Sequence, residues 1–336
     1  MDVVGVASGG ASVKDLAPHV SAPSTPPNGA RDGQLMDGSS LAVRLANFVK
    51  LPHTVFAMPF ALVGVLFAST IAPISGRMIG WVMVAFTAAR FAAMGFNRIV
   101  DRDVDAVNPR TANRELPRGV LTLAQAKVSV IVASLLFVYA SYQLNTLCAA
   151  LSPLALLWVL TYSYTKRFTR WSHLWLGLGL SIAPVGGYLA VTGAWSDPWW
   201  QLCAFAMVVV TWSAGFDMLY SLQDAEFDRV NGLHSIPSAL GVPSAIRLAR
   251  ALHVVSVLCL TVVVASQPLV NSAPAAQSIL WAGVVWMAGM LVWEHRLVSA
   301  DDLSRIDAAF FTMNGVISIG FLVIVLVARF VGVSAS

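Results

Sequence analysis

Two short motifs each place a pair of carboxylates four residues apart, where a long apolar segment gives way to a polar loop. The first pair is Asp101 and Asp105, and the second is Asp224 and Asp228. Because residues i and i+4 share one face of an α-helix, each motif presents both carboxylates on the same side. Proteins usually hold Mg²⁺ with one or two carboxylates, while phosphate oxygens and water complete its shell. The two pairs therefore predict two facing Mg²⁺ sites that would bind a diphosphate.

The position of these acids favours this interpretation over a simpler one. Carboxylates at the end of an apolar segment are costly, so they are functional candidates by default. For a single pair, solvated acids beside arginines would be the better explanation, but the same spacing found twice favours metal binding. Asp103 and Glu226 fall midway in the motifs, so we expect them to point away and to be solvated or paired with a neighbouring arginine. Asp217, seven residues before Asp224, either assists the second metal or ordered water, or has a structural hydrogen bond.

The composition indicates which elements must position these motifs. The chain is 57% hydrophobic and 11% charged, whereas soluble domains are about 25% charged. We therefore expect an all-α, polytopic membrane bundle, whose spanning helices need about 20 residues each. The sequence has no basic stripe with interleaved aromatic residues of the kind that would indicate nucleic-acid binding. About nine apolar segments are long enough, at 51–70, 78–98, 122–143, 146–165, 171–192, 199–221, 250–270, 277–294 and 308–330.

The distribution of charge predicts the orientation of the bundle. Lys and Arg are concentrated in alternate loops, whereas the other loops show only Arg77 and, at the far end, Arg329. By the positive-inside rule, the N-terminus and both acidic motifs lie on the cytoplasmic side of the plasma membrane and the C-terminus lies on the opposite side. Residues 1–40 are rich in Ser, Ala, Gly, Pro and Asp, so we expect a disordered cytoplasmic tail before a membrane domain at 41–336.

A third group of polar residues ends the fourth apolar segment. Tyr162 and Lys166 share a helix face at i, i+4, so a phenol and an ammonium could both point toward a phosphate. Aromatic and basic residues are also ordinary anchors at membrane interfaces, so this motif has weight only beside the acids. We expect Lys166 to add positive charge around a diphosphate, with further contributions from Arg102, Arg110 and Arg114.

The motifs, taken together, resemble those of a known family. Three occur in this order: Asn97-x3-Asp101-x3-Asp105, Tyr162-x3-Lys166-Arg167 and Asp224-x3-Asp228. They look like the signature motifs of the UbiA superfamily of intramembrane prenyltransferases, over roughly residues 41–330. The resemblance implies a central cavity capped on the cytoplasmic side, two Mg²⁺ ions and a tunnel for an isoprenoid tail. Many members have an acid where this chain has Arg98, so Arg98 is not carried over as a ligand.

The resemblance also implies a reaction and its residues. The family transfers a prenyl group from its diphosphate to an aromatic or other lipophilic acceptor. The expected metal-binding and catalytic residues are Asp101, Asp105, Asp224 and Asp228, with Lys166 as a further catalytic residue. The expected diphosphate-binding residues are Asn97, Arg102, Arg110, Arg114, Tyr162 and Lys166. No protein partner is inferred.

The first apolar segment bears on the acceptor. The stretch from Phe48 to Phe60 resembles a branch that contains 4-hydroxybenzoate polyprenyltransferases and prenyltransferases of the futalosine route to menaquinone. Lys50 and His53 are candidates to contact an acceptor carboxylate, or they anchor and pack the helix. We place 4-hydroxybenzoate first and 1,4-dihydroxy-6-naphthoate second.

Two other classes of protein remain as alternatives. An ion-coupled secondary transporter would use the acids for coupling ions near the bilayer midplane. The placement of the acids beside Arg-rich loops counts against it. A non-catalytic membrane scaffold would use them only to solvate its loops.

Overall fold

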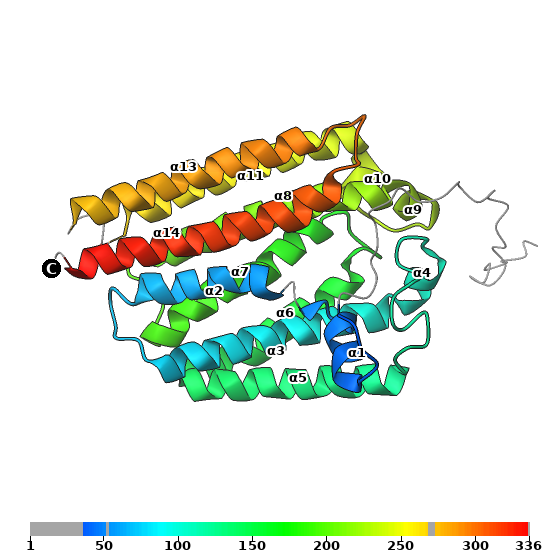
Figure 1. The fold of residues 1–336 in the computed structure, drawn as a ribbon, viewed down its shortest axis with the longest axis horizontal. Coiled ribbons are helices and arrows are strands. Elements are labelled where there is room, and N and C mark those ends of the chain that lie inside the picture. The colour runs from blue at the N-terminus through cyan, green and yellow to red at the C-terminus, as the bar shows by residue number, and fades with distance from the viewer. Residues whose placement is uncertain (1–35, 52–53, 268–272, 335–336) are drawn as a thin grey trace, which may run out of the picture. The chain divides into compact units, whose positions relative to one another are not determined.

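The computed structural model describes residues 36–51, 54–267 and 273–334, and the regular elements in these ranges are all helical (Figure 1). The all-α class predicted from the composition is therefore confirmed. The elements before the second motif are α1 (Leu41–Phe48), α2 (Thr54–Ala68), α3 (Gly76–Val100), α4 (Arg102–Val107), α5 (Leu123–Leu144), α6 (Thr146–Thr165), α7 (Ser172–Thr192) and α8 (Trp199–Tyr220). Those that follow are η3 (Ser221–Asp224), α9 (Ala225–Val230), α10 (Ile236–Leu240), α11 (Val242–Ala265), α13 (Pro274–Leu297), η4 (Ala308–Met313) and α14 (Asn314–Ser334).

Within those ranges, eight helices are long and apolar enough to cross a membrane. They correspond to the second through ninth of the predicted segments. The first predicted segment, 51–70, contains α2, which has only 15 residues. This is shorter than the roughly 20 residues that a perpendicular span needs. Residues 1–35 of the predicted tail lie outside the described residues.

The boundary between the third and fourth predicted segments is a single residue. Asn145 lies in an extended conformation between α5 and α6, and its side chain accepts a hydrogen bond from Cys148 N–H as an N-cap. Its amide group also donates to Leu189 O at 2.8 Å. One side chain thus begins α6 and ties this turn to α7, which explains how so short a polar stretch separates two helices.

Two glycines let α2 and α7 approach closely. A Cβ atom on Gly64 would collide with the carbonyl oxygen of Pro184, and one on Gly187 would collide with that of Ala61. Small residues allow such backbone contact between membrane helices. α7 also packs against α8, α8 against α11, and α14 against both α13 and α2.

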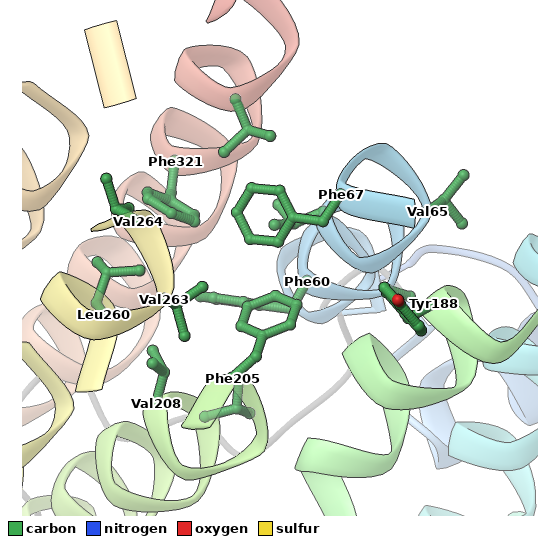
Figure 2. Close-up of a cluster of buried hydrophobic side chains, with 14 of the residues drawn as sticks. Phe60, Val65, Phe67, Tyr188, Phe205, Val208, Leu260, Val263, Val264 and Phe321 are labelled. Carbon is green, nitrogen blue, oxygen red and sulfur yellow. The ribbon is translucent and has the colours of Figure 1, made fainter. Parts of the chain in front are cut away.

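The largest buried apolar cluster joins seven helices, α2, α3, α7, α8, α11, α13 and α14. Figure 2 shows Phe60 and Phe67 of α2 among side chains of α7, α8, α11 and α14. The ring centroids of Phe67 and Phe205 lie 5.2 Å apart, at an angle typical of favourable aromatic pairs. This packing fixes α2 and α8 as walls of the cavity described below.

The polar elements gather at one end of the bundle. The short helices α4, α9 and α10 lie together there, whereas α14 ends at the opposite end (Figure 1). Both acidic motifs therefore lie at the same end, away from the C-terminus.

Candidate active site

The two acidic motifs share one backbone arrangement. Asp101 stands at the junction of α3 and α4 with φ −93° and ψ 4°, and Asp224 stands before α9 with φ −99° and ψ 1°. Asp105 and Asp228 each lie in the short helix that follows. Asp105 N–H donates to Asp101 O at 2.7 Å. The predicted i, i+4 relationship is therefore preserved, although each motif spans a junction between two helices.

The loop after the first motif reaches the second motif. Arg110 donates to both oxygens of Asp224, at 2.9 Å from Nε to Oδ1 and 2.6 Å from Nη2 to Oδ2. Asn108 Nδ2 also donates to Asp224 Oδ1 at 3.4 Å. Arg114, in the same loop, donates from Nη1 to Oδ1 of Asp105 in the first motif at 2.7 Å. These contacts bring the two predicted acid pairs to one site.

The third motif supplies partners for the remaining two carboxylates. Lys166, directly after α6, places its Nζ 3.6 Å from Asp228 Oδ2. Arg167 Nη2 donates to Asp101 Oδ1 at 3.1 Å, and Asn97 Nδ2 donates to Asp101 Oδ2 at 2.8 Å. All four motif carboxylates are thus paired with a basic side chain of this chain.

The surroundings of these groups shift their proton affinities. Burial raises the pKa of Asp101 to about 6, although the neighbouring Arg167 acts in the opposite direction. Burial works against the charge of Lys166, but Asp228 and Asp224 outweigh it and raise the pKa of this lysine. Lys166 is therefore a protonated cation at neutral pH.

Two carboxylate oxygens have no hydrogen-bond donor. Asp105 Oδ2 and Asp228 Oδ2 are both buried, and no described residue donates a hydrogen bond to either oxygen. Within the described ranges, no three His, Cys, Asp or Glu side chains converge as a complete metal site. One or two carboxylates with phosphate oxygens and water are nevertheless the usual shell of Mg²⁺. The residues present therefore fit Mg²⁺ that binds together with a phosphate group.

The site lies in a cavity of about 890 Å³. All of the paired groups above line it, as do Asn97 and Tyr162. Much of its remaining wall is apolar. Its aromatic lining residues are Phe60, Phe86, Phe137, Trp158, Tyr162, Trp175, Trp195, Trp212, Phe216, Tyr220, Phe227, Phe310 and Phe311. Trp158 and Trp175 stack at 4.1 Å, and each indole N–H donates to the backbone oxygen of the other residue. The cavity thus joins a charged end to a rigid aromatic wall.

Other predicted residues lie elsewhere. Arg102 is outside the cavity lining and pairs with Asp103, where both side chains are exposed. Glu226 pairs with Arg229 in the same way. The expectation that the midway acids point away and pair with arginines is therefore confirmed. His53 lies outside the described residues.

Lys50 lines the cavity beside η4, with its ammonium 5.7 Å from the centroid of the Phe311 ring. Burial lowers the pKa of Lys50 to about 7, and repulsion by Arg98, Arg114 and Arg110 contributes to this shift, while Glu115 opposes it. The charge of Lys50 therefore changes near neutral pH.

The sequence analysis did not identify Arg90 as a candidate. It lies within α3, lines the cavity and donates from Nε to Thr54 Oγ1 at 3.1 Å. No ion pair joins it to a carboxylate among the described residues. A single arginine inside an apolar segment was the signal that could have identified it.

Asp217 has a structural partner that the sequence did not reveal. The oxygen Oδ2 of Asp217 lies 2.7 Å from Nδ1 of the fully buried His173. Since Ile236 N–H points at His173 Nε2 from 3.5 Å, this ring nitrogen acts as the acceptor and Nδ1 donates to Asp217. Of the two roles left open for Asp217, the structural hydrogen bond is therefore present.

Comparison with known proteins gives a consistent result. Residues 57–316 match the model of the UbiA prenyltransferase family. A polyprenyl transferase from Arthrobotrys oligospora is 32% identical over 155 residues, which are 46% of this chain and 42% of that protein. A 4-hydroxybenzoate octaprenyltransferase from Neisseria meningitidis serogroup B is 32% identical over 164 residues, which are 48% of this chain and 54% of that protein. These matches span about half the length of the curated relatives.

Solved structures cover more of the chain. A UbiA homolog from Aeropyrum pernix K1 is 31% identical, with a TM-score of 0.72 over 82% of this chain and 98% of that one. A UbiA homolog from Archaeoglobus fulgidus, bound to GPP and Mg²⁺, has a TM-score of 0.67 over 85% of this chain and 99% of that one. At 16% identity, this second similarity concerns the fold alone.

Proposed function

Because this chain belongs to the UbiA prenyltransferase family, we propose that it transfers a polyprenyl group from polyprenyl diphosphate to the ring of an aromatic acid. The preferred acceptor is 4-hydroxybenzoate, in ubiquinone-type biosynthesis. The observation that carries this proposal is that four carboxylate–cation pairs share one cavity with an aromatic wall and a buried arginine. The four carboxylate–cation pairs suit a metal diphosphate, the aromatic wall suits a prenyl chain and the buried arginine suits a carboxylate.

The charged end would bind the diphosphate by an exchange of partners. Asp101, Asp105, Asp224 and Asp228 would hold two Mg²⁺ ions. The cations that they release would then contact phosphate oxygens. Those cations are Arg110, Arg114, Lys166 and Arg167, and charge-assisted hydrogen bonds to phosphate are among the strongest in proteins. Bound Mg²⁺ would supply Lewis-acid stabilisation of the charge on the diphosphate.

The transfer itself needs little covalent participation by the protein. The allylic C–O bond breaks and its electron pair leaves with the diphosphate, whose charge Lys166 and the arginines stabilise. A ring carbon next to the acceptor hydroxyl forms the new C–C bond, and the proton on that carbon passes to a motif carboxylate or to water, which restores aromaticity. The aromatic wall excludes water from the allylic cation and presents ring faces to it. Trp158 and Trp175, fixed by their mutual hydrogen bonds, are suited to this role.

The acceptor carboxylate would bind Arg90. Among the described residues, the buried guanidinium of Arg90 is hydrogen-bonded only to the Thr54 hydroxyl, so its other donors suit a bidentate carboxylate. Lys50 lies four residues before Thr54, the first residue of α2, and would add a second positive charge. The arrangement favours an aromatic acid over a neutral lipid acceptor. It also serves 1,4-dihydroxy-6-naphthoate, which carries the same group.

The placement of Lys and Arg in the loops supports an orientation in which the charged end faces the cytoplasm. A water-soluble diphosphate head group could enter from that side, while the apolar part of the cavity would hold its tail.

An acceptor panel tests the proposal. The purified chain in lipid nanodiscs is incubated with Mg²⁺, an all-trans polyprenyl diphosphate and each aromatic acid, and products are identified by mass spectrometry. We expect prenylated 4-hydroxybenzoate that disappears on chelation and is absent from Asp101→Ala and Asp224→Ala variants. Product from 1,4-dihydroxy-6-naphthoate alone would reassign the acceptor. Full activity in either variant would refute the metal assignment.

A further inference from the structure

Arg98 is a buried arginine that forms no ion pair with another described residue. It lies in the last turn of α3, beside the first acidic motif, and only 3% of its surface is exposed. Its Nη1 atom is buried without a hydrogen-bond acceptor. No residue in the described part of the chain forms an ion pair with its guanidinium. Arg98 nevertheless lines the cavity.

The surroundings of Arg98 do not neutralise it. The groups that act on it electrostatically are Arg114, Glu115, Asp105, Arg110 and Lys50. Asp105 is already bound by Arg114, and in the described part of the chain Glu115 acts on Arg98 only through longer-range electrostatics, without a hydrogen bond or an ion pair. Arg98 therefore adds to a local excess of positive charge on the diphosphate end of the cavity.

An isolated buried charge is costly unless it is paired. A guanidinium that lines a cavity and has no anionic partner among the described residues is thus arranged for an anion that enters. Arg110 and Arg114, its neighbours, pair with the carboxylates of both acidic motifs. The anion beside those carboxylates in the proposed function is the diphosphate.

We infer that Arg98 is a further diphosphate-binding residue, which contacts the phosphate oxygens directly rather than through a metal ion. This inference rests on the proposed function and deepens it. Its consequence is that the site keeps part of its affinity for a prenyl diphosphate when Mg²⁺ is removed. Arg98, which was not carried over as a metal ligand, would then bind the diphosphate instead of the metal ion.

The test uses geranyl thiodiphosphate, an unreactive probe, with the full chain in nanodiscs. Binding and thermal unfolding are measured with Mg²⁺ and with EDTA. We expect Arg98→Met to weaken binding in EDTA about tenfold or more, as loss of a charged hydrogen bond implies. Arg98→Lys should restore part of the affinity. Arg229→Met, a control that removes an exposed arginine of the same end, should bind as the wild type does.

The unfolding measurement separates ligand binding from a structural role. Removal of an unpaired buried charge should leave the ligand-free protein at least as stable as the wild type, while the stabilisation by the probe becomes smaller. Unchanged binding by Arg98→Met in EDTA would overturn this inference alone. The inference would also be overturned if Arg98→Met lost 4-hydroxybenzoate binding but bound the probe normally. If the wild-type chain does not bind the probe even with Mg²⁺, the proposed function itself fails.

Discussion

Arg110 binds both carboxylate oxygens of Asp224 across a sequence separation of 114 residues. The pair is largely buried, with 18% of the arginine side chain and 10% of the aspartate side chain exposed. It joins the loop after α4 to the second acidic motif. The same two side chains are the groups that would separate when a metal diphosphate binds, the aspartate to metal and the arginine to phosphate.

Arg110→Met therefore has two opposite effects. Breaking a buried ion pair leaves an uncompensated carboxylate and costs roughly 3–5 kcal/mol. Mg²⁺ can neutralise the carboxylate that has lost its arginine, so we expect it to raise the unfolding temperature of this variant more than that of the wild type. We also expect kcat to fall on the order of 10²-fold, because a cation on the leaving group is lost. Equal Mg²⁺ stabilisation of both proteins would contradict the exchange of partners.

Asp105→Asn and Asp228→Asn test the two buried oxygens without donors. Each substitution replaces an oxygen that we propose binds metal, while the size of the side chain is kept. We expect the Mg²⁺ concentration for half-maximal activity to rise on the order of tenfold or more, since the affinity of Mg²⁺ depends on carboxylate charge. The matched controls are Asp103→Asn and Glu226→Gln, the exposed acids midway in the same motifs. A similar Mg²⁺ requirement in all four variants would argue against these ligands.

The four acids were identified from the sequence because their spacing is local and each motif folds within a few residues. The long-range contacts of the site and its surroundings were not, because the Arg110–Asp224 and His173–Asp217 pairs form across 114 and 44 residues. Hydropathy predicted the eight long helices because each is a continuous apolar run, which is also a local signal. The shortness of α2 was hidden because the apolar pattern extends beyond the helix.

The pKa of Lys50 makes acceptor binding depend on pH. Burial and the neighbouring arginines lower this pKa to about 7. As the pH rises through about 7, Lys50 loses its proton, so we expect the affinity for 4-hydroxybenzoate to fall. The bound carboxylate shifts the midpoint upward, because it favours the charged lysine. Lys50→Arg stays charged and should flatten the profile, which titration calorimetry between about pH 6 and 8 can measure. The same pH dependence in both proteins would exclude Lys50 as its source.

Arg90→Met tests the carboxylate site within α3. We expect the KM for 4-hydroxybenzoate to rise about tenfold or more, because a charged hydrogen bond contributes roughly 1.5–3 kcal/mol. The KM for the polyprenyl diphosphate should stay within about twofold, since this arginine pairs with none of the motif acids in the described structure. The methyl ester of 4-hydroxybenzoate supplies the matched control, because it lacks the charge. The wild type should prefer the acid to the ester, and Arg90→Met should lose that preference. If the variant still discriminates between them, the carboxylate binds elsewhere in the cavity.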